Sequence, residues 1–147
     1  MSQMPIACVE ISLFAHATED ENRVIEAVRH LLPAAQVENI VFNKSGLRGH
    51  YGNPITLYEK RIKEKETVKA VVENLSFGLS PLDKESLLRE VELHVEKGNL
   101  YLRFDKQAAF LGQFELGVSD PIRVRLRFKK NRLEDIVQIC REIGMFP

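Results

Sequence analysis

A run of alternating residues near the C-terminal end, Ile122-Arg-Val-Arg-Leu-Arg-Phe-Lys129, constrains the fold of this chain more than any other feature. Successive side chains of a β-strand point to opposite faces of the sheet, so the apolar residues of the run share one face and its cations share the other. We therefore predict a strand that packs one face on a hydrophobic core and leaves the other in solvent. Cations on that face would repeat every ~6.8 Å, comparable to the step between neighbouring phosphates of a nucleic acid.

The rest of the chain predicts one α+β domain over residues 1–147, with a mixed β-sheet and helices packed on one face. Apolar alternation predicts further strands over residues 7–15, 37–42 and 100–105. Capping residues and helical spacing predict helices that begin near Thr18, Pro54, Ser80 and Asn131, the second reaching about Leu75. Residues 106–117 are ambiguous, and Gly144 after the last helix is typical of a C-terminal cap.

Composition favours a soluble, cytoplasmic protein. Hydrophobic residues make up 44% of the chain and charged residues 29%, and no apolar stretch approaches the length of a membrane span. Cys8 and Cys140 lie in apolar patterns near opposite ends, which is neither a disulfide framework nor a metal-binding spacing. We therefore expect no secretory signal, membrane partner, metal or other cofactor.

The charge is balanced overall but unevenly distributed. The chain has 21 basic and 21 acidic residues, of which six basic residues and one acid lie between Asp120 and Arg132. The remainder has 15 basic and 20 acidic residues, a net charge of −5. A concentrated basic patch on a mildly acidic body can steer an anion to one face.

The cationic strand face predicts contacts to RNA phosphates by Arg123, Arg125, Arg127 and Lys129, since arginine binds phosphate through two donors at once. If the strand over 100–105 lies beside it, Tyr101 and Arg103 add a stacking ring and another cation. Lys106, which follows directly, is a further candidate contact. Two alternatives stay open: an edge strand whose cations prevent aggregation, and neutralisation of an arginine by Asp105.

The segment Lys44-Ser-Gly-Leu-Arg-Gly-His-Tyr-Gly-Asn53 predicts a glycine-rich loop. Its glycines let backbone N–H groups approach an anion, and the candidate contacts within it are Lys44, Arg48, His50 and Tyr51. The segment lacks the ending of a Walker loop and the spacing of a dinucleotide-binding fingerprint. A plain structural turn is the alternative.

Histidines offer the only route to catalysis that the sequence suggests. His16 and His50 could meet Asp105 or Asp120 in a hydrolase or nuclease site, but no nucleophile motif and no metal-ligand spacing accompanies them. We therefore predict no catalytic residues and a protein that is not an enzyme.

Four strings resemble a small archaeal family described as predicted RNA-binding or exosome-associated proteins: His16-Ala-Thr-Glu-Asp20, Gly49-His-Tyr-Gly-Asn-Pro-Ile55, Leu100 to Gly112 and Asp120-Pro-Ile-Arg-Val124. The resemblance implies a fold similar to that of the ribosomal protein that binds 5S ribosomal RNA, homodimers, and a setting in RNA processing. It brings no catalytic residues, and it directs attention to residues 49–53 and 103–107.

The leading hypothesis is thus an RNA-binding accessory protein, associated with the exosome or with ribosomal RNA, that contacts phosphates through the basic strand face and the glycine-rich loop. A homodimeric protein-interaction module of a larger assembly is the first alternative, and a hydrolase is the second.

Overall fold

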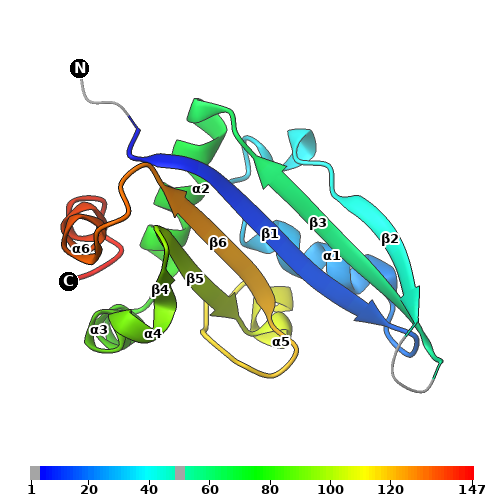
Figure 1. Ribbon diagram of the computed structural model, residues 1–147. Helices are drawn as coiled ribbons and strands as arrows, with labels where there is room; N and C mark the ends of the chain where they lie inside the picture. The colour runs from blue at the N-terminus through cyan, green and yellow to red at the C-terminus, as the bar shows by residue number, and fades with distance from the viewer. Residues whose placement is uncertain (1–3, 49–51) are drawn as a thin grey trace.

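The computed structural model describes residues 4–48 and 52–147, which form a β-sheet with helices against it (Figure 1). The strands are β1 (Ile6–His16), β2 (Asn43–Arg48), β3 (Pro54–Ile62), β4 (Val95–Glu96), β5 (Asn99–Phe104) and β6 (Ile122–Phe128). The helices are α1 (Glu21–His30), α2 (Lys65–Gly78), α3 (Pro81–Arg89), α4 (Val91–His94), α5 (Lys106–Phe110) and α6 (Leu133–Glu142), with a 3-10 turn at Val37–Asn39.

The strands form one six-stranded sheet in the order β2-β3-β1-β6-β5-β4. The predicted α+β class is confirmed, although every pairing between described strands is antiparallel and the sheet is not mixed. The long strand β1 lies at the centre, between β3 and β6. Because β6 has neighbours on both sides, the alternative that its cations guard a free edge is wrong.

The core lies between the sheet and the helices, which Figure 1 shows behind it as α1, α2 and α5. In β1, Val9, Ile11 and Leu13 are buried, while the residues between them are only partly covered. Residues facing them from the helices include Val28 of α1 and Leu75 of α2, both fully buried. Full burial of such a side chain stabilises the folded state by about 1.5–3 kcal/mol. The face of β1 that carries the apolar side chains therefore packs against the helices.

The segment from residue 37 to residue 62 differs from the prediction. The expected strand over 37–42 is a 3-10 turn followed by irregular backbone, and residues 44–48, the first half of the expected loop, belong to β2. The expected helix from Pro54 to about Leu75 is wrong in its first part, which is β3 with Tyr58 and Ile62 buried opposite β1. It is confirmed from Lys65 onward, where α2 begins. Pairing with β1 over eight positions outweighs the local charge pattern that suggested a helix.

Helix boundaries agree with the sequence in part. Ser80 caps α3 as predicted, and Gly144 adopts a φ of +85° where Met145 N–H donates to the Cys140 carbonyl at 2.9 Å. The cap of α1 is Asp20 rather than Thr18, because the Asp20 carboxylate accepts from the backbone N–H of Asn22.

Candidate nucleic-acid interface

The face of the sheet turned away from the helices faces the viewer in Figure 1. It is polar over β5, β6 and the adjoining part of β1, whereas the end near β2 carries Phe14, Leu57 and Leu47. Directly paired residues of an antiparallel sheet point to the same side, so the strand registers arrange this face in rows. One row is Glu59, Ser12, Arg123, Arg103; the next is Arg61, Glu10, Arg125, Tyr101. We call these eight residues and Arg127 the open face. Five arginines and two glutamates give it an excess of positive charge.

Arg103 and Arg123 are direct cross-strand neighbours on the open face. Both are exposed, and within the described chain neither has a carboxylate within 4.0 Å. The Arg123 guanidinium carbon lies 5.5 Å from the centre of the Phe14 ring, which holds the group close to the sheet. Like charges directly opposite each other destabilise a sheet, so these two guanidinium groups repel each other.

Arg125 does not have the free guanidinium that the sequence predicts. Its Nη2 lies 2.6 Å from Oε2 of Glu10, whose other oxygen accepts from Nε of Arg61 at 2.6 Å. The Nε of Arg125 is out of contact with solvent and has no partner among the described residues. Glu10 thus neutralises two cations. Asp105, which the sequence left open as an alternative partner for an arginine, instead caps α5 by accepting from Ala108 N–H at 2.8 Å.

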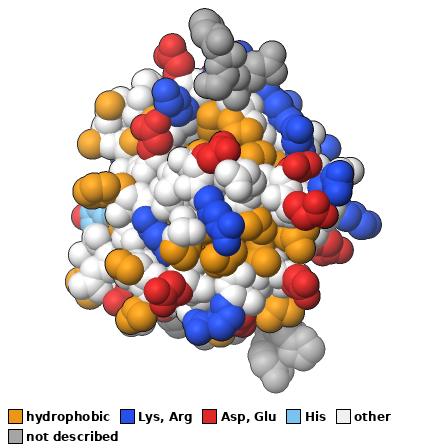
Figure 2. All heavy atoms as spheres, turned by 90° about the vertical axis from the view of Figure 1, so that its left-hand side faces the viewer, with side chains coloured by type: hydrophobic (Ala, Val, Ile, Leu, Met, Phe, Trp, Pro, Cys, Tyr) orange, Lys and Arg blue, Asp and Glu red, His pale blue; other side chains and the backbone are white. Residues whose placement is uncertain are grey.

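A shallow hollow of about 190 Å³ lies where these rows meet. Its polar lining is Glu10, Ser12, Tyr101 and the three arginines Arg103, Arg123 and Arg125. The predicted position of a tyrosine beside the cations is therefore confirmed. Arg127 and Lys129 are exposed and extend the cationic line along the strand direction. Figure 2 shows this face edge-on at its right-hand side, where side chains of both charges crowd together.

The glycine-rich segment contributes cations to the opposite side of the sheet. Lys44 pairs with the buried Tyr58, so Lys44 and Arg48 point to the helix side. Lys44 Nζ lies 3.0 Å from Glu21 Oε2, and hydrogen bonds from Lys44 and then Thr56 lower the pKa of Glu21. Arg48 donates to the Gly52 carbonyl at 3.3 Å. The predicted contacts His50 and Tyr51 lie outside the described residues.

Lys106, the remaining predicted contact, is buried instead of exposed. Its ammonium donates to the Phe14 carbonyl at 2.7 Å. It also lies 3.0 Å from Oε1 of Glu19 and 2.6 Å from Oδ2 of Asp120. These three partners use the three donors of an ammonium, so Lys106 joins the end of β1 to two loops and has no donor left for a phosphate.

Asp120 brings His16 to the same cluster, since His16 Nε2 lies 3.1 Å from Asp120 Oδ1. Burial alone raises the pKa of Asp120, but hydrogen bonds from Lys106 and His16 outweigh it and leave the pKa below its ordinary value. The ligand atoms of His16, Glu19 and Asp120 lie within 4.8 Å of one another, yet the Lys106 ammonium already occupies the carboxylates. Of the proposed hydrolase residues, the structure therefore joins His16 to Asp120 but not to Asp105.

Residues 8–128 match the model of a protein family described as RNA binding. The chain belongs to this RNA-binding family. It is 35% identical over 139 residues to an RNA-binding protein of Pyrococcus abyssi, across 91% of this chain and 90% of that one. It is also 32% identical over 145 residues to an uncharacterized protein of Methanocaldococcus jannaschii, across 92% of this chain and 97% of that one.

A solved structure supports the same assignment. The crystal structure of a DUF54 protein of Archaeoglobus fulgidus superposes with a TM-score of 0.81 at 31% identity, covering 94% of this chain and 99% of that one. The region that matches the RNA-binding family runs from β1 to the end of β6, and it therefore contains the whole open face. Within residues 4–48 and 52–147, no helix is both long and apolar enough to cross a bilayer.

Sequence reasoning missed part of the open face. Glu10, Ser12 and Phe14 stand at alternate positions of β1, between the apolar residues that identified the strand. Their alternation indicates that they share the solvent face, but only the register with β6 shows that Glu10 meets Arg125 and Ser12 meets Arg123. Arg61 was missed because its segment was interpreted as a helix.

Proposed function

We propose that this protein binds RNA across the open face, with phosphates held by Arg103, Arg123 and Arg127 and a base stacked on Tyr101. One observation carries the proposal: Arg103 and Arg123 are opposite each other and exposed, and no carboxylate of the described chain lies within 4.0 Å of either guanidinium group. A phosphate between them removes their mutual repulsion and accepts donors from both guanidinium groups. Membership of the RNA-binding family supports the same partner.

The geometry of the open face suits a nucleic-acid strand better than an isolated anion. Arg123 and Arg127 stand on the same face of one strand, four positions apart, so their Cα atoms are separated by about 13–14 Å. That span accommodates two phosphate steps, with Arg125 and Tyr101 between them. A ring beside cations is the arrangement by which proteins stack splayed bases of single-stranded RNA.

An accessory role in RNA processing at the exosome, or on ribosomal RNA, is part of the proposal, as is a cytoplasmic location. Support for the assembly, and for a fold akin to the 5S RNA-binding ribosomal protein, comes from the resemblance noted in the sequence. Support for the compartment comes from Cys8 and Cys140, which are buried free thiols that fit a reducing environment. Affinity purification with a tagged chain, followed by sequencing of the retained RNA, tests the role. The proposed role would be rejected if the retained RNA were not ribosomal and no exosome subunit were retained with the tagged chain.

The binding experiment is a titration of labelled single-stranded RNA at several salt concentrations. Each phosphate contact contributes about 0.7 to the log–log slope of affinity against salt, so the triple variant Arg103→Gln/Arg123→Gln/Arg127→Gln should lower the slope by about 2. The matched control is Lys65→Gln/Lys69→Gln/Arg141→Gln, which removes the same charge from exposed positions on α2 and α6. The proposal fails if both variants change the slope equally.

The contribution of the glycine-rich segment, through Lys44 and Arg48, is a separate proposal. Lys44 and Arg48 can contact the RNA only if the RNA strand passes around the β2 edge of the sheet to the helix side. The variant Lys44→Gln/Arg48→Gln should then lower the salt slope by a further amount of up to about 1.4. An unchanged slope would confine binding to the open face.

The edge of the sheet favours a second candidate function, a homodimeric protein-interaction module. All six residues of β2 are exposed, β2 ends the described sheet, and Leu47 is 45% exposed on the same side as the open face. An unpaired edge strand is a template for another strand, and two copies would join two open faces. Light scattering should give twice the chain mass, and Leu47→Lys should give the chain mass. A monomer before the substitution would exclude this candidate.

A further inference from the structure

The hollow of about 190 Å³ on the open face lies at one end of the line of arginines along β6. Arg127 stands at the other end of this line, and Arg125 stands between. Past Arg123, the next position of the same strand face is Pro121, which precedes β6, carries no charge and is buried. The line of cations therefore stops at the hollow, and RNA that follows the line makes its last arginine contacts there.

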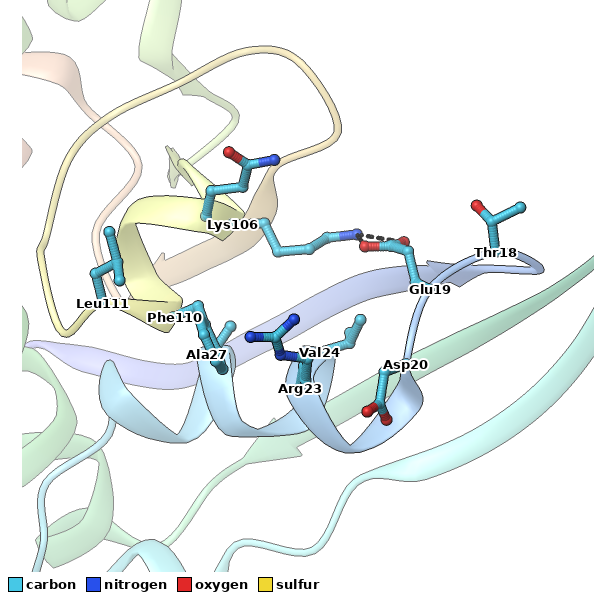
Figure 3. Close-up of a pocket in the computed structure, with 10 residues that line it drawn as sticks. Thr18, Glu19, Asp20, Arg23, Val24, Ala27, Lys106, Phe110 and Leu111 are labelled. Carbon is cyan, nitrogen blue, oxygen red and sulfur yellow. Dashed lines mark hydrogen bonds and ion pairs between the residues drawn. The ribbon is translucent and has the colours of Figure 1, made fainter.

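A cluster with more acids than cations lies past this end of the line. Oδ1 of Asp120 lies 3.1 Å from Nε2 of His16, the last residue of β1. The ammonium of Lys106 joins Asp120 to Glu19, and its bond to Glu19 is the dashed contact in Figure 3. With His16 neutral, the two carboxylates exceed the single ammonium by one charge. A further phosphate beyond the hollow is therefore disfavoured.

The charge of the hollow exceeds that of one internal phosphate of a strand. Three arginines and one glutamate line it, which leaves two positive charges. Glu10 holds Arg125 at 2.6 Å, whereas no carboxylate of the described chain lies within 4.0 Å of Arg103 or Arg123. An internal phosphodiester carries one negative charge, but a phosphate monoester carries about 1.5–2 at pH 7. The monoester matches the hollow more closely.

The donors of the hollow also suit a phosphate monoester. Ser12 is paired with Arg123, and Arg123 is paired with Arg103, so one hydroxyl and two guanidinium groups line the hollow in a single row. A phosphate monoester has three oxygens that are free to accept hydrogen bonds, whereas an internal diester has two. Each of the three side chains can then donate to an oxygen of its own.

We propose that the hollow binds the terminal phosphate monoester of an RNA strand, with Ser12, Arg103 and Arg123 as its donors and Tyr101 beside the first base. This inference rests on the proposed RNA function, because the cations toward Arg127 then hold the phosphates that follow the end. Hydrolysis of a phosphodiester bond is the class of reaction that leaves such an end. A 5′ and a 3′ phosphate share this chemistry, and the experiment separates them.

The test compares labelled oligoribonucleotides by fluorescence anisotropy at physiological salt. An octamer carries a phosphate at its 5′ end in one arm and at its 3′ end in the other, with the label at the opposite end. Each is compared with a hydroxyl-ended nonamer that extends the same end by one nucleotide, so that the same phosphate becomes an internal diester. At least one octamer should bind about tenfold more tightly than its nonamer. A gain below about threefold at both ends would overturn the inference.

A serine substitution locates the effect in the hollow. Ser12→Ala removes one donor without changing the charge, and it should reduce the gain from the terminal phosphate several-fold. The matched control is Ser45→Ala, at an exposed position of β2 outside the hollow, which should retain the gain. A gain reduced equally by both substitutions, or by neither, would contradict the assignment of the site.

Failure of the inference is distinguishable from failure of the proposed function. If neither end is preferred while Arg103→Gln/Arg123→Gln/Arg127→Gln still lowers the salt slope of hydroxyl-ended RNA by about 2, the inference fails and the proposed function stands. If that slope ignores the three arginines, the proposed function fails. An NMR titration with ribose 5-phosphate then decides the fate of the hollow: shifted Nε resonances of Arg103 and Arg123 would retain a monoester site, and unshifted ones would remove it.

Discussion

Replacing Glu10 by glutamine should strengthen RNA binding, although it removes an ion-paired residue from the centre of the sheet. Glu10 holds Arg125 and Arg61 at 2.6 Å each, so its carboxylate competes with a phosphate for two guanidinium groups. Its side chain is 24% exposed, and loss of a partly exposed pair costs about 1 kcal/mol of stability or less. The fold should therefore persist, and the open face should gain two free cations.

The magnitude follows from counterion release. Two additional phosphate contacts raise the log–log slope of affinity against salt by about 1.4 for single-stranded RNA. Between 50 and 200 mM salt, the affinity of Glu10→Gln should thus fall about sevenfold more than that of the natural chain. The gain in RNA affinity of Glu10→Gln over the natural chain should be largest at low salt.

Fluorescence anisotropy with a labelled oligoribonucleotide measures the affinity at each salt concentration and hence the salt slope. The matched control is Glu59→Gln, which removes a glutamate from the same face but frees no arginine, because no cation of the described chain lies within 4.0 Å of Glu59. Glu59→Gln should leave the slope nearly unchanged. A slope for Glu10→Gln equal to that of Glu59→Gln would refute the view that Glu10 withholds arginines from RNA.

Three further predictions concern the rest of the molecule. Lys106→Met should lower the free energy of unfolding by about 3 kcal/mol in urea denaturation, because it leaves Glu19 and Asp120 without their buried cation; a loss below about 1 kcal/mol would contradict this. Asp120 has a pKa lowered by folding, so its contribution to stability is present above the unfolded pKa and is lost as the pH falls through the folded pKa; Asp120→Asn should be less stable than the natural chain at pH 7 and lose less stability by pH 3. Burial raises the pKa of Cys140 to about 12, so its thiol should react with Ellman's reagent at pH 8 only as fast as the chain unfolds.

The two strands richest in local information could be predicted from the sequence. In β5 and β6, apolar and polar residues alternate without interruption, so the buried face and the cationic face follow from the period of a strand alone. Their pairing, with Tyr101 opposite Arg125, was only a condition of the prediction, because residues 105–121 separate the two strands in the sequence.

The edge of the sheet could not be predicted in the same way. Glycines made β2 resemble a loop, and Pro54 followed by interleaved charges made β3 resemble a helix. What decides these strands is non-local: Tyr58 and Ile62 pack beside β1, more than 40 positions earlier in the chain. A prediction from local composition takes account only of the secondary-structure preference of each segment and not of its partners in the sheet.

The roles of individual charges were the hardest to foresee. Glu10 neutralises Arg125 because β1 and β6 align these two positions, and Lys106 is buried because three distant segments converge on its ammonium. Each role depends on a register or a contact between segments that the sequence does not display. Arg103 and Arg123 have the predicted exposure, and no carboxylate of the described chain lies within 4.0 Å of either.

The most direct test is chemical modification of arginine with phenylglyoxal, read out by peptide mass spectrometry with and without bound RNA. Arg103 and Arg123 should react in the free protein and be protected once RNA is bound, while Arg141 on α6 should react equally in both states. RNA binding that leaves Arg103 and Arg123 as reactive as before would contradict the proposal that their opposed guanidinium groups hold the phosphate.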